Sequence, residues 1–550
     1  MSMARRMHLS MVVLAALVVV GVACADPPEP QTNPPEQAEQ PAASGPRNGG
    51  RLVMAVESDP GDLRPTAGPW DSSALQVGRA VFDRLADYSD TYQLEPALAE
   101  SFTPNVDFTE WAITLRADLV FHDGTPLDAE ALRANLEAQR TSPAAEALLR
   151  PVRAVFVTGP RTVNVRLRAP WSTFPHVLTT QVGFVASPAS LMAVDGGARP
   201  VGSGPFRVRA RGTDGSFVLG KSPTYWRDGL PRLDEIVVRV FPEGAARVRA
   251  VEEGKVDVAL VDDPVLLALA SARRAARRTQ VLADLEGEAP KLTVVLNAGR
   301  MPFSDFSARQ ALGYATDRAE IVGDGDRGFV KWARGPVVDT SLWYNDPPVL
   351  PHSLAATETE LERFTDRYGT SLTFEVLVPD DPVIRRFTTR WGQQLRDAGI
   401  SARFRVVPLA EVRQAAAVGG FDAAVLPLFG SWHPDLWYPQ LHLSELTPVG
   451  APGPNLARLG SPGIDGSFDS ARATTELARQ VDAYRAIQND VVTGAAYLFL
   501  VRLPQGLVAG PDVRDLTQRT TPRGSPGLGM EQGTVSLTQV WLDREARDTE

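Results

Sequence analysis

The sequence predicts an α/β fold with more than one domain. A chain of 550 residues is long enough for two to four domains. Its composition, 43% hydrophobic and 22% charged, is globular and excludes wholesale disorder and a collagen-like fibre. Strand and helix patterns alternate along the chain, as in residues 372–378, 382–398 and 402–407, and this order is typical of βαβ units.

Hydrophobic spacing predicts the individual elements. Alternating or continuous apolar runs predict strands at 51–56, 111–116, 162–167, 206–209, 217–219, 236–241, 256–261, 291–297, 421–428 and 497–501. Apolar residues three and four apart predict helices at 73–86, 127–139, 245–253, 307–322 and 474–492. Asp214-Gly215 indicates a hairpin between two of these strands, and Asp128 is placed to cap the second helix.

Charge and cysteine content exclude several classes of protein. The formal net charge is −10, whereas nucleic-acid binding depends on basic residues that contact phosphates. We therefore expect no nucleic-acid partner. Cys24 is the single cysteine, so neither a disulfide framework nor a Cys-based zinc site can form within one chain.

The first 24 residues have the layout of a signal peptide. Arg5 and Arg6 precede an apolar run over residues 11–22, which is shorter than the ~20 residues that span a bilayer. Ala23-Cys24 at the end of this run resembles a bacterial lipoprotein cleavage site, which makes Cys24 the expected lipidation residue. A plain secretory signal is the alternative; Arg5-Arg6 only faintly resembles a twin-arginine signal.

Residues 25–48 read as a disordered tether. They contain seven prolines among polar residues and no large apolar side chain, so they cannot bury enough surface to offset their ordering entropy. No later apolar run in the sequence is long enough to span a membrane. We expect a globular body held near a membrane surface by a lipid on Cys24.

Seven segments, in order, resemble the family 5 extracytoplasmic solute-binding proteins, the peptide- and nickel-type receptors of ABC importers. These segments are 94–102 (LEPALAESF), 120–127 (VFHDGTPL), 201–206 (VGSGPF), 225–226 (YW) with 233–236 (LDEI), 253–257 (EGKVD), 309–312 (RQAL) with 317–318 (DR), and 432–439 (WHPDLWYP). The resemblance covers roughly residues 49–505.

The resemblance implies a two-lobed periplasmic-binding-protein-like fold (type II, class C) with an extra inserted domain. Lobe I is expected from residues 49–83, 199–290 and 506–550, the inserted domain from 84–198, and lobe II from 291–505. Chain crossings near Leu296-Asn297 and Leu503-Pro504 are the expected hinge, about which closure buries a ligand.

The segment from Gly430 to Pro439 is the main candidate for ligand binding, because it follows the strand at 421–428 and ligands bind beyond strand ends in α/β sheets. In peptide-binding relatives an Asp in the matching segment pairs with the ligand's α-amino group, and this role falls on Asp435. Trp432, Trp437 and Tyr438 are candidate apolar walls. An ordinary loop with packed aromatics is the alternative.

Two further candidates, Arg64 and Trp70, lie in the loop after the first strand, which in relatives reaches into the cleft. Three other motifs read as structural: His122-Asp123 stabilises a turn, Gly202 to Pro205 forms a turn between lobes, and Tyr225-Trp226 is a packed aromatic anchor.

Signatures of catalysis are missing from the sequence. It contains no G-x-S-x-G elbow, no H-E-x-x-H and no Walker motif, so we expect no enzyme and no cofactor. His433, His442 and Asp435 could together ligate a metal, which is a minor alternative. The carboxylate pairs Asp262-Asp263 and Asp380-Asp381 precede prolines and are explained by turn chemistry.

These observations predict a monomeric, lipid-anchored receptor on the extracytoplasmic face of a bacterial cell membrane. It binds a peptide-like or other small polar solute by lobe closure and delivers it to an ABC permease. One alternative is a cell-envelope regulatory or scaffold lipoprotein that uses the same fold without transport. A hydrolase or a metal receptor is a third, weaker hypothesis.

Overall fold

The computed structural model describes residues 45–193, 197–285, 287, 289–323 and 328–544. The chain divides into two compact units, Met1–Pro46 and Arg47–Glu550, and every helix and strand named below belongs to the second. Cys24 and most of the expected tether lie outside the described residues, so both remain predictions.

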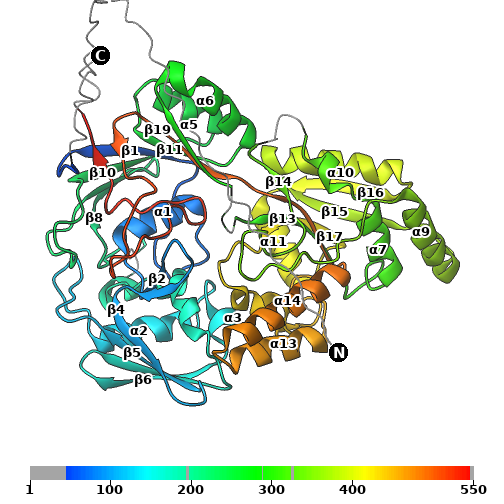
Figure 1. Ribbon diagram of the computed structural model, residues 1–550, viewed down its shortest axis with the longest axis horizontal. Helices are drawn as coiled ribbons and strands as arrows, with labels where there is room; N and C mark the ends of the chain where they lie inside the picture. The colour runs from blue at the N-terminus through cyan, green and yellow to red at the C-terminus, as the bar shows by residue number, and fades with distance from the viewer. Residues whose placement is uncertain (1–44, 194–196, 286, 288, 324–327, 545–550) are drawn as a thin grey trace, which may run out of the picture. The chain divides into compact units, whose positions relative to one another are not determined.

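A seven-stranded mixed sheet organises the part that we call lobe I (Figure 1). Its central strand, β1, runs parallel to a neighbour on each side, and the outer strands are antiparallel. Across the sheet the order is β12 (Gln280–Asp284), β19 (Gln505–Ala509), β11 (Val258–Val261), β1 (Arg51–Val56), β10 (Glu235–Val240), β9 (Phe217–Lys221) and β8 (Phe206–Arg211). The helices are α1 (Ser72–Val81), α5 (Gly244–Glu252) and α6 (Pro264–Arg277).

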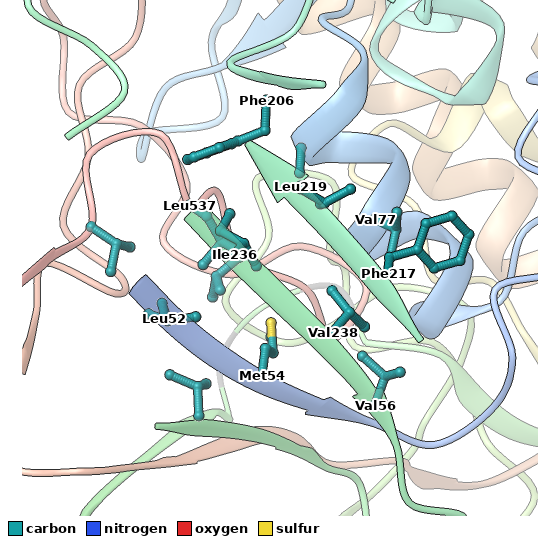
Figure 2. Close-up of a cluster of buried hydrophobic side chains, with 14 of the residues drawn as sticks. Leu52, Met54, Val56, Val77, Phe206, Phe217, Leu219, Ile236, Val238 and Leu537 are labelled. Atoms are coloured by element: carbon teal, nitrogen blue, oxygen red, sulfur yellow. The ribbon is translucent and has the colours of Figure 1, made fainter. Parts of the chain in front are cut away.

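Alternate residues of these strands form the core of lobe I. Leu52, Met54 and Val56 point from β1 into a cluster with side chains of β8, β9 and β10, with Val77 of α1 and with Leu537 near the C-terminus (Figure 2). The expected hairpin between β8 and β9 forms across Asp214-Gly215. A continuous core of this kind supplies the apolar burial that stabilises the lobe.

The inserted domain contains a four-stranded antiparallel sheet in the order β4 (Ala99–Pro104), β5 (Glu110–Leu115), β7 (Thr162–Leu167) and β6 (Val152–Gly159). Helix α2 (Ala129–Gln139) begins at the expected cap, because the Asp128 side chain accepts a hydrogen bond from the Ala131 amide. The remaining elements are β2 (Ala86–Tyr88), β3 (Leu94–Pro96), α3 (Glu146–Leu149), η1 (Phe174–Thr179), η2 (Gln181–Gly183) and α4 (Pro188–Met192).

A six-stranded sheet organises lobe II, in the order β14 (Lys331–Trp332), β18 (Tyr497–Arg502), β13 (Lys291–Leu296), β17 (Ala423–Leu428), β15 (Thr373–Pro379) and β16 (Ser401–Val407). The expected βαβ unit is present, since β15 and β16 are parallel and α10 (Pro382–Asp397) packs on both (Figure 1). The other helices are α7 (Phe306–Ala315), α8 (Arg318–Ile321), α9 (Leu354–Tyr368), α11 (Leu409–Val418), η4 (Pro434–Trp437), α12 (Tyr438–Leu441), η5 (Leu443–Glu445), α13 (Pro462–Arg472) and α14 (Leu477–Thr493).

The chain crosses between the two large sheets twice, and one crossing differs from the expectation. The crossing at Leu503-Pro504, between β18 and β19, lies where it was predicted. The other runs through residues 285–290, between β12 and β13, so the prediction at Leu296-Asn297 was wrong. Asn297 instead follows a lobe II strand, where its buried amide donates to the carbonyls of Gly419 and Phe421. The crossing therefore lies one strand earlier than Leu296-Asn297, beside the boundary expected between residues 290 and 291.

Two predicted helices are shorter than their hydrophobic spacing suggests. Helix α1 ends at Val81, where the backbone of the 202–204 turn packs closely; a Cβ on Gly202 would lie 2.2 Å from the Val81 carbonyl oxygen. The helix expected over 307–322 is broken into α7 and α8, because the Asp317 side chain caps α8 by accepting from the Ala319 and Glu320 amides. Both breaks are set by polar or backbone contacts rather than by apolar periodicity.

Short strands β20 (Val513–Arg514) and β21 (Trp541–Leu542) complete the described part of the chain. No helix within that part is both long and apolar enough to cross a membrane.

Candidate functional site

A cavity of about 540 Å³ lies between lobe I and lobe II, beside the chain crossings. Its walls follow the ends of strands in both sheets: Glu57 and Ser58 follow β1, Asp262 follows β11, Asp381 follows β15, and Phe429 and Gly430 follow β17. The carboxyl ends of β1 and β11 share one sheet edge because these strands are parallel, and the same holds for β15 and β17. Such edges are where open α/β sheets bind ligands.

The charged lining of this cavity has an acidic excess. Four carboxylates (Glu57, Asp71, Asp262 and Asp381) face two guanidiniums (Arg247 and Arg413), which leaves a formal excess of two negative charges. Two of these carboxylates have a local structural role as helix caps: Asp71 accepts from the Ala74 amide and Asp381 from the Ile384 amide. Glu57 and Asp262 have no such role in a helix cap.

Glu57 and Asp262 share one cation. Both carboxylates lie 3.5 Å from the Nη2 atom of Arg247, a long contact for an ion pair. The other donors of Arg247 are directed to backbone carbonyls of Phe241, Pro242 and Leu260. One guanidinium held mainly by the backbone therefore balances two carboxylates only partly.

Burial and crowding of like charges shift the pKa of both carboxyls. Burial in the cleft, with a further contribution from Asp262, raises the pKa of Glu57 to about 7, while Arg247 opposes the shift. Burial likewise raises the pKa of Asp262, against the effect of Arg247. A cationic group entering the cavity would favour the ionised form of both carboxyls.

The lobe II wall carries an arginine that makes no close ion pair. Among the described residues, no carboxylate lies within ion-pair distance of the Arg413 guanidinium. Burial lowers the pKa of Arg413, while Asp71 on the opposite lobe raises it. The cavity thus presents one cation on lobe II as well as the acidic group on lobe I.

Two polar atoms of the lining residues have no hydrogen-bond partner among the described residues. They are the Nε1–H donor of Trp70, from lobe I, and the Oε1 acceptor of Gln440, from lobe II. Burying a donor or an acceptor without a partner costs about 1–3 kcal/mol. Both atoms are covered by neighbouring protein atoms, so a bound molecule reaches them only if the lining rearranges.

The structure brings one of the six predicted ligand residues, Trp70, to the cavity. The Trp70 ring packs against Phe82 and Phe184, with centroids 6.0 and 5.3 Å away. Arg64 lies outside the cavity lining and pairs with Asp62, whose Oδ2 accepts from the Arg64 Nε atom at 3.0 Å.

Asp435 also lies outside the cavity lining, and its carboxylate is already engaged by protein groups. Its side chain is fully buried, Oδ1 accepts from the Arg472 Nε atom at 2.7 Å, and Oδ2 accepts from Arg472 Nη2 at 3.2 Å. The Trp171 indole of the inserted domain donates to Oδ2 at 2.6 Å. The geometry therefore does not support the expected pairing of Asp435 with a ligand ammonium, because Arg472 already donates to both carboxylate oxygens.

The three aromatic candidates of the same segment pack against protein. The Trp432 ring stacks on Tyr92 of the inserted domain with centroids 4.5 Å apart. Trp437 is buried behind the cavity residue Phe429, at 5.6 Å between centroids. The Arg472 Cζ atom lies 3.6 Å from the centre of the Tyr438 ring. A role in ligand binding for these residues and for Asp435 stays a prediction.

Sequence reasoning missed the acidic residues of the cavity. Asp262 and Asp381 were assigned to turns because each precedes or adjoins a proline, and Asp381 is indeed a helix cap. Their position directly after buried strands was the available signal, and it applies equally to Glu57. Arg413 and Arg472 carried no signal, because the sequence offers many arginines and no spacing distinguishes them.

The histidines of the 430–442 segment have partners other than a metal. His433 stacks on His176, and His442 stacks on Tyr438 with centroids 4.2 Å apart. Within the described ranges, no three His, Cys, Asp or Glu side chains gather as metal ligands would.

Two lobes joined by two crossings, with a cavity at facing strand ends, define a two-lobed binding protein of the type II periplasmic class. The chain belongs to the bacterial extracellular solute-binding proteins, family 5, because the model of that family's middle region matches residues 93–447.

Curated and solved relatives agree with this membership. The chain is 26% identical over 485 residues to the probable D,D-dipeptide-binding periplasmic protein DdpA of Escherichia coli K12, covering 84% of this chain and 90% of that protein. It is similar in fold to the binding protein AgaA of A. tumefaciens R10 in complex with agropinic acid (TM-score 0.77, 22% identity, 90% of this chain and 99% of that chain). It is also similar to DppA of Helicobacter pylori in complex with the peptide STSA (TM-score 0.76, 18% identity, 90% and 99%).

Proposed function

We propose that this protein is the lipid-anchored substrate-binding component of an ABC importer and that its solute is small, polar and positively charged at one end. The observation that carries the proposal is the cavity of about 540 Å³ lined from both lobes with an excess of two carboxylates. This volume falls within the ~300–1,000 Å³ typical of small-molecule sites.

The charge distribution supports a ligand with groups of both signs. A cationic group placed near Glu57 and Asp262 would complete the partial pairing that Arg247 provides. An acceptor on the same ligand would suit Arg413, whose close contacts include no carboxylate among the described residues. A short peptide or another amino-acid derivative carries both groups, and relatives that bind dipeptides and peptides support this class.

A cleft filled by side chains would favour the alternative of an envelope scaffold without transport. The open cavity between the lobes favours solute binding instead. Lipid anchoring rests on the Ala23-Cys24 pattern alone, and the intact mass of the mature N-terminus would decide it.

Calorimetry on the purified full-length protein tests the proposed solute class. The panel pairs each di- to pentapeptide with its N-acetylated form, which lacks the ammonium group. We expect a bound peptide to lose about 10- to 150-fold in affinity on acetylation, since a hydrogen bond to a charged group contributes about 1.5–3 kcal/mol. The same loss is expected for the Asp262→Asn variant with the free peptide.

Asp380→Asn is the matched control, because Asp380 adjoins Asp381 but is exposed, pairs with Arg385 and does not line the cavity. It should leave affinity unchanged. Equal binding of free and acetylated peptides would refute the cationic class. The solute-binding function itself would be refuted if no panel member bound and native mass spectrometry found no co-purified solute.

A further inference from the structure

A second interface joins the inserted domain to lobe II, away from the cavity. Arg150, Trp171, Ser172 and His176 of the inserted domain meet the segment of lobe II that contains His433, Asp435 and Glu445, and the end of α13. None of these residues lines the cavity. We call this interface the latch.

Direct polar contacts hold the latch together. The Ser172 amide donates to the Arg472 carbonyl at 2.7 Å, and its hydroxyl donates to the Thr474 carbonyl at 2.6 Å. Trp171 donates to Asp435 at 2.6 Å, and Arg150 forms an ion pair with Glu445 at the edge. All of these bonds join lobe II to the inserted domain, so any motion that separates these two parts must break them.

Two stacked histidines lie at the centre of the latch. The rings of His176, from the inserted domain, and His433, from lobe II, have centroids 3.9 Å apart and an interplanar angle of 27°. His433 is 4% exposed. The Tyr88 hydroxyl lies 2.7 Å from His176 Nδ1, and His433 Nδ1 accepts from the Asp435 amide at 3.2 Å. Each imidazole therefore has one nitrogen in a hydrogen bond within its own part of the molecule.

The groups around this pair disfavour a positive charge. Arg472 faces His433. Asp435, the one carboxylate near the pair in the described part of the chain, raises the pKa of His176 but is itself paired with Arg472. Tyr88 and Tyr484 are the remaining titratable neighbours, and Trp343 packs edge-on against His433. Burial, reinforced by Arg472, lowers the pKa of His433 to about 3; burial and the facing His433 hold the pKa of His176 well below its usual value.

We propose that the latch is an acid-sensitive closure device, which holds the lobes closed while His176 and His433 are neutral and releases them when both take up protons. The inference rests on the proposed function, in that it regulates access to the same cavity. Above the pKa of a solvated histidine, about 6.5, the closed state has its full stability, and this stability is lost as the pH falls below that value.

The expected change in the closed-to-open ratio follows from the linkage between opening of the lobes and proton uptake by the two histidines. If both rings are solvated when the lobes open, each lowers the closed-to-open ratio about thirty-fold between pH 7.5 and pH 5, or roughly a thousand-fold together. Partial solvation of either ring in the closed state reduces this value.

Hydrogen–deuterium exchange of the ligand-free, full-length protein measures this ratio. The Ser172 amide donates its hydrogen bond across the latch. Its protection from exchange should therefore fall by up to a thousand-fold from pH 7.5 to pH 5, after correction for the intrinsic pH dependence of exchange. Amides of β10, in the core of lobe I, should keep their protection.

Three variants test whether the two histidines, rather than other groups that titrate in acid, cause the loss of protection. The double variant His176→Phe/His433→Phe keeps two aromatic rings that cannot titrate. The Ser172 amide should therefore keep its protection from exchange in acid. Arg150→Gln removes the edge ion pair and should lower protection at every pH while the pH dependence persists. His352→Gln, at an exposed histidine remote from the latch, should behave as the wild type.

The proposal is overturned if Ser172 protection is independent of pH in the wild type, if the double variant retains the loss, or if β10 loses protection in parallel. If the double variant does not fold, the single His176→Phe variant must lose about half as much Ser172 protection between pH 7.5 and pH 5 as the wild type, on a logarithmic scale. Because no solute is present, the latch can fail while solute binding stands, and the reverse also holds.

Discussion

The cavity and the latch both contain charged residues where separate parts of the molecule meet, but they satisfy these charges in opposite ways. In the latch, Asp435 receives three hydrogen bonds from Arg472 and Trp171, with lengths of 2.6–3.2 Å. In the cavity, Glu57 and Asp262 reach their shared arginine only at 3.5 Å.

This difference indicates separate roles for the two regions. The side chains of Glu57 and Asp262 are 44% and 58% exposed, so both carboxyls are open to the cavity while Arg247 pairs with them only at long range. A cationic group that enters the cavity would complete this pairing. In the latch, Asp435 is neutralised by Arg472 of its own lobe, and the Trp171 indole adds a bond from the inserted domain. The cavity is incomplete within the chain, which is what selective binding of a solute requires.

The largest expected effect comes from breaking the latch ion pair. Arg472→Met leaves the Asp435 carboxylate buried without its cation and should lower the free energy of unfolding by about 3–5 kcal/mol, measured by urea denaturation. The double variant Asp435→Asn/Arg472→Met removes both charges, keeps an acceptor for the Trp171 indole, and should recover most of this loss.

Arg479→Met is the matched control for that comparison. Arg479 pairs with Glu476 at 2.8 Å, but both side chains are more than 60% exposed, so its loss should cost less than about 1 kcal/mol. Equal destabilisation by the two arginine substitutions would contradict the description of the latch as a buried, complete pair.

A smaller effect is expected in the cavity as a dependence of binding on pH. Burial raises the pKa of Glu57 to about 7, so the carboxyl takes up a proton as the pH falls through that value and a cationic solute loses a partner. Affinity should fall by at most about tenfold per pH unit below 7, and solvent access to this half-exposed carboxyl reduces the slope.

Calorimetry between pH 5.5 and 8.0, in two buffers of different ionisation enthalpy, measures both the affinity and the proton released on binding. The Glu57→Gln variant should show a flatter pH dependence and less proton release. A wild-type affinity that is independent of pH, or a variant with the wild-type slope, would argue against a cationic group near Glu57.

The smallest expected effect concerns the helix that carries Arg472. Gly466 lies inside α13, and a Cβ there would meet no atom within 4 Å. Gly466→Ala should stabilise the protein by about 0.5–1 kcal/mol through helix propensity, measured by urea denaturation. Gly204→Ala is the contrasting variant, because its Cβ would lie 2.6 Å from the Val81 carbonyl carbon, and it should destabilise. Destabilisation by Gly466→Ala would show that α13 is not a regular helix there.

Local patterns in the sequence predicted much of the secondary structure. The strand at Thr162–Leu167, the cap at Asp128 and the unit formed by β15, α10 and β16 were all predicted from spacing and cap residues. Helix α13 was not predicted, because Pro462, Gly463 and Gly466 are poor helix formers, although Ser461 caps it and Pro462 occupies its first turn. Proline is tolerated there because the first helical amides lack partners within the helix.

The candidate site was less predictable than the fold. The segment at 430–439 was placed correctly after a strand, yet the inserted domain covers it and Arg472 neutralises its carboxylate. Trp70 was the one predicted ligand residue that lines the cavity, whereas Glu57, Asp262 and Asp381 were not named as ligand residues.

The sequence alone determined the fold class and the family, because hydrophobic periodicity and short ordered motifs act over a few neighbouring residues. Tertiary structure alone decided which carboxylates face solute and which are neutralised by the protein. That choice depends on pairs such as Asp435 with Arg472, or Glu57 with Arg247, that fold together from distant segments, and electrostatic pairing follows distance in space rather than separation along the chain.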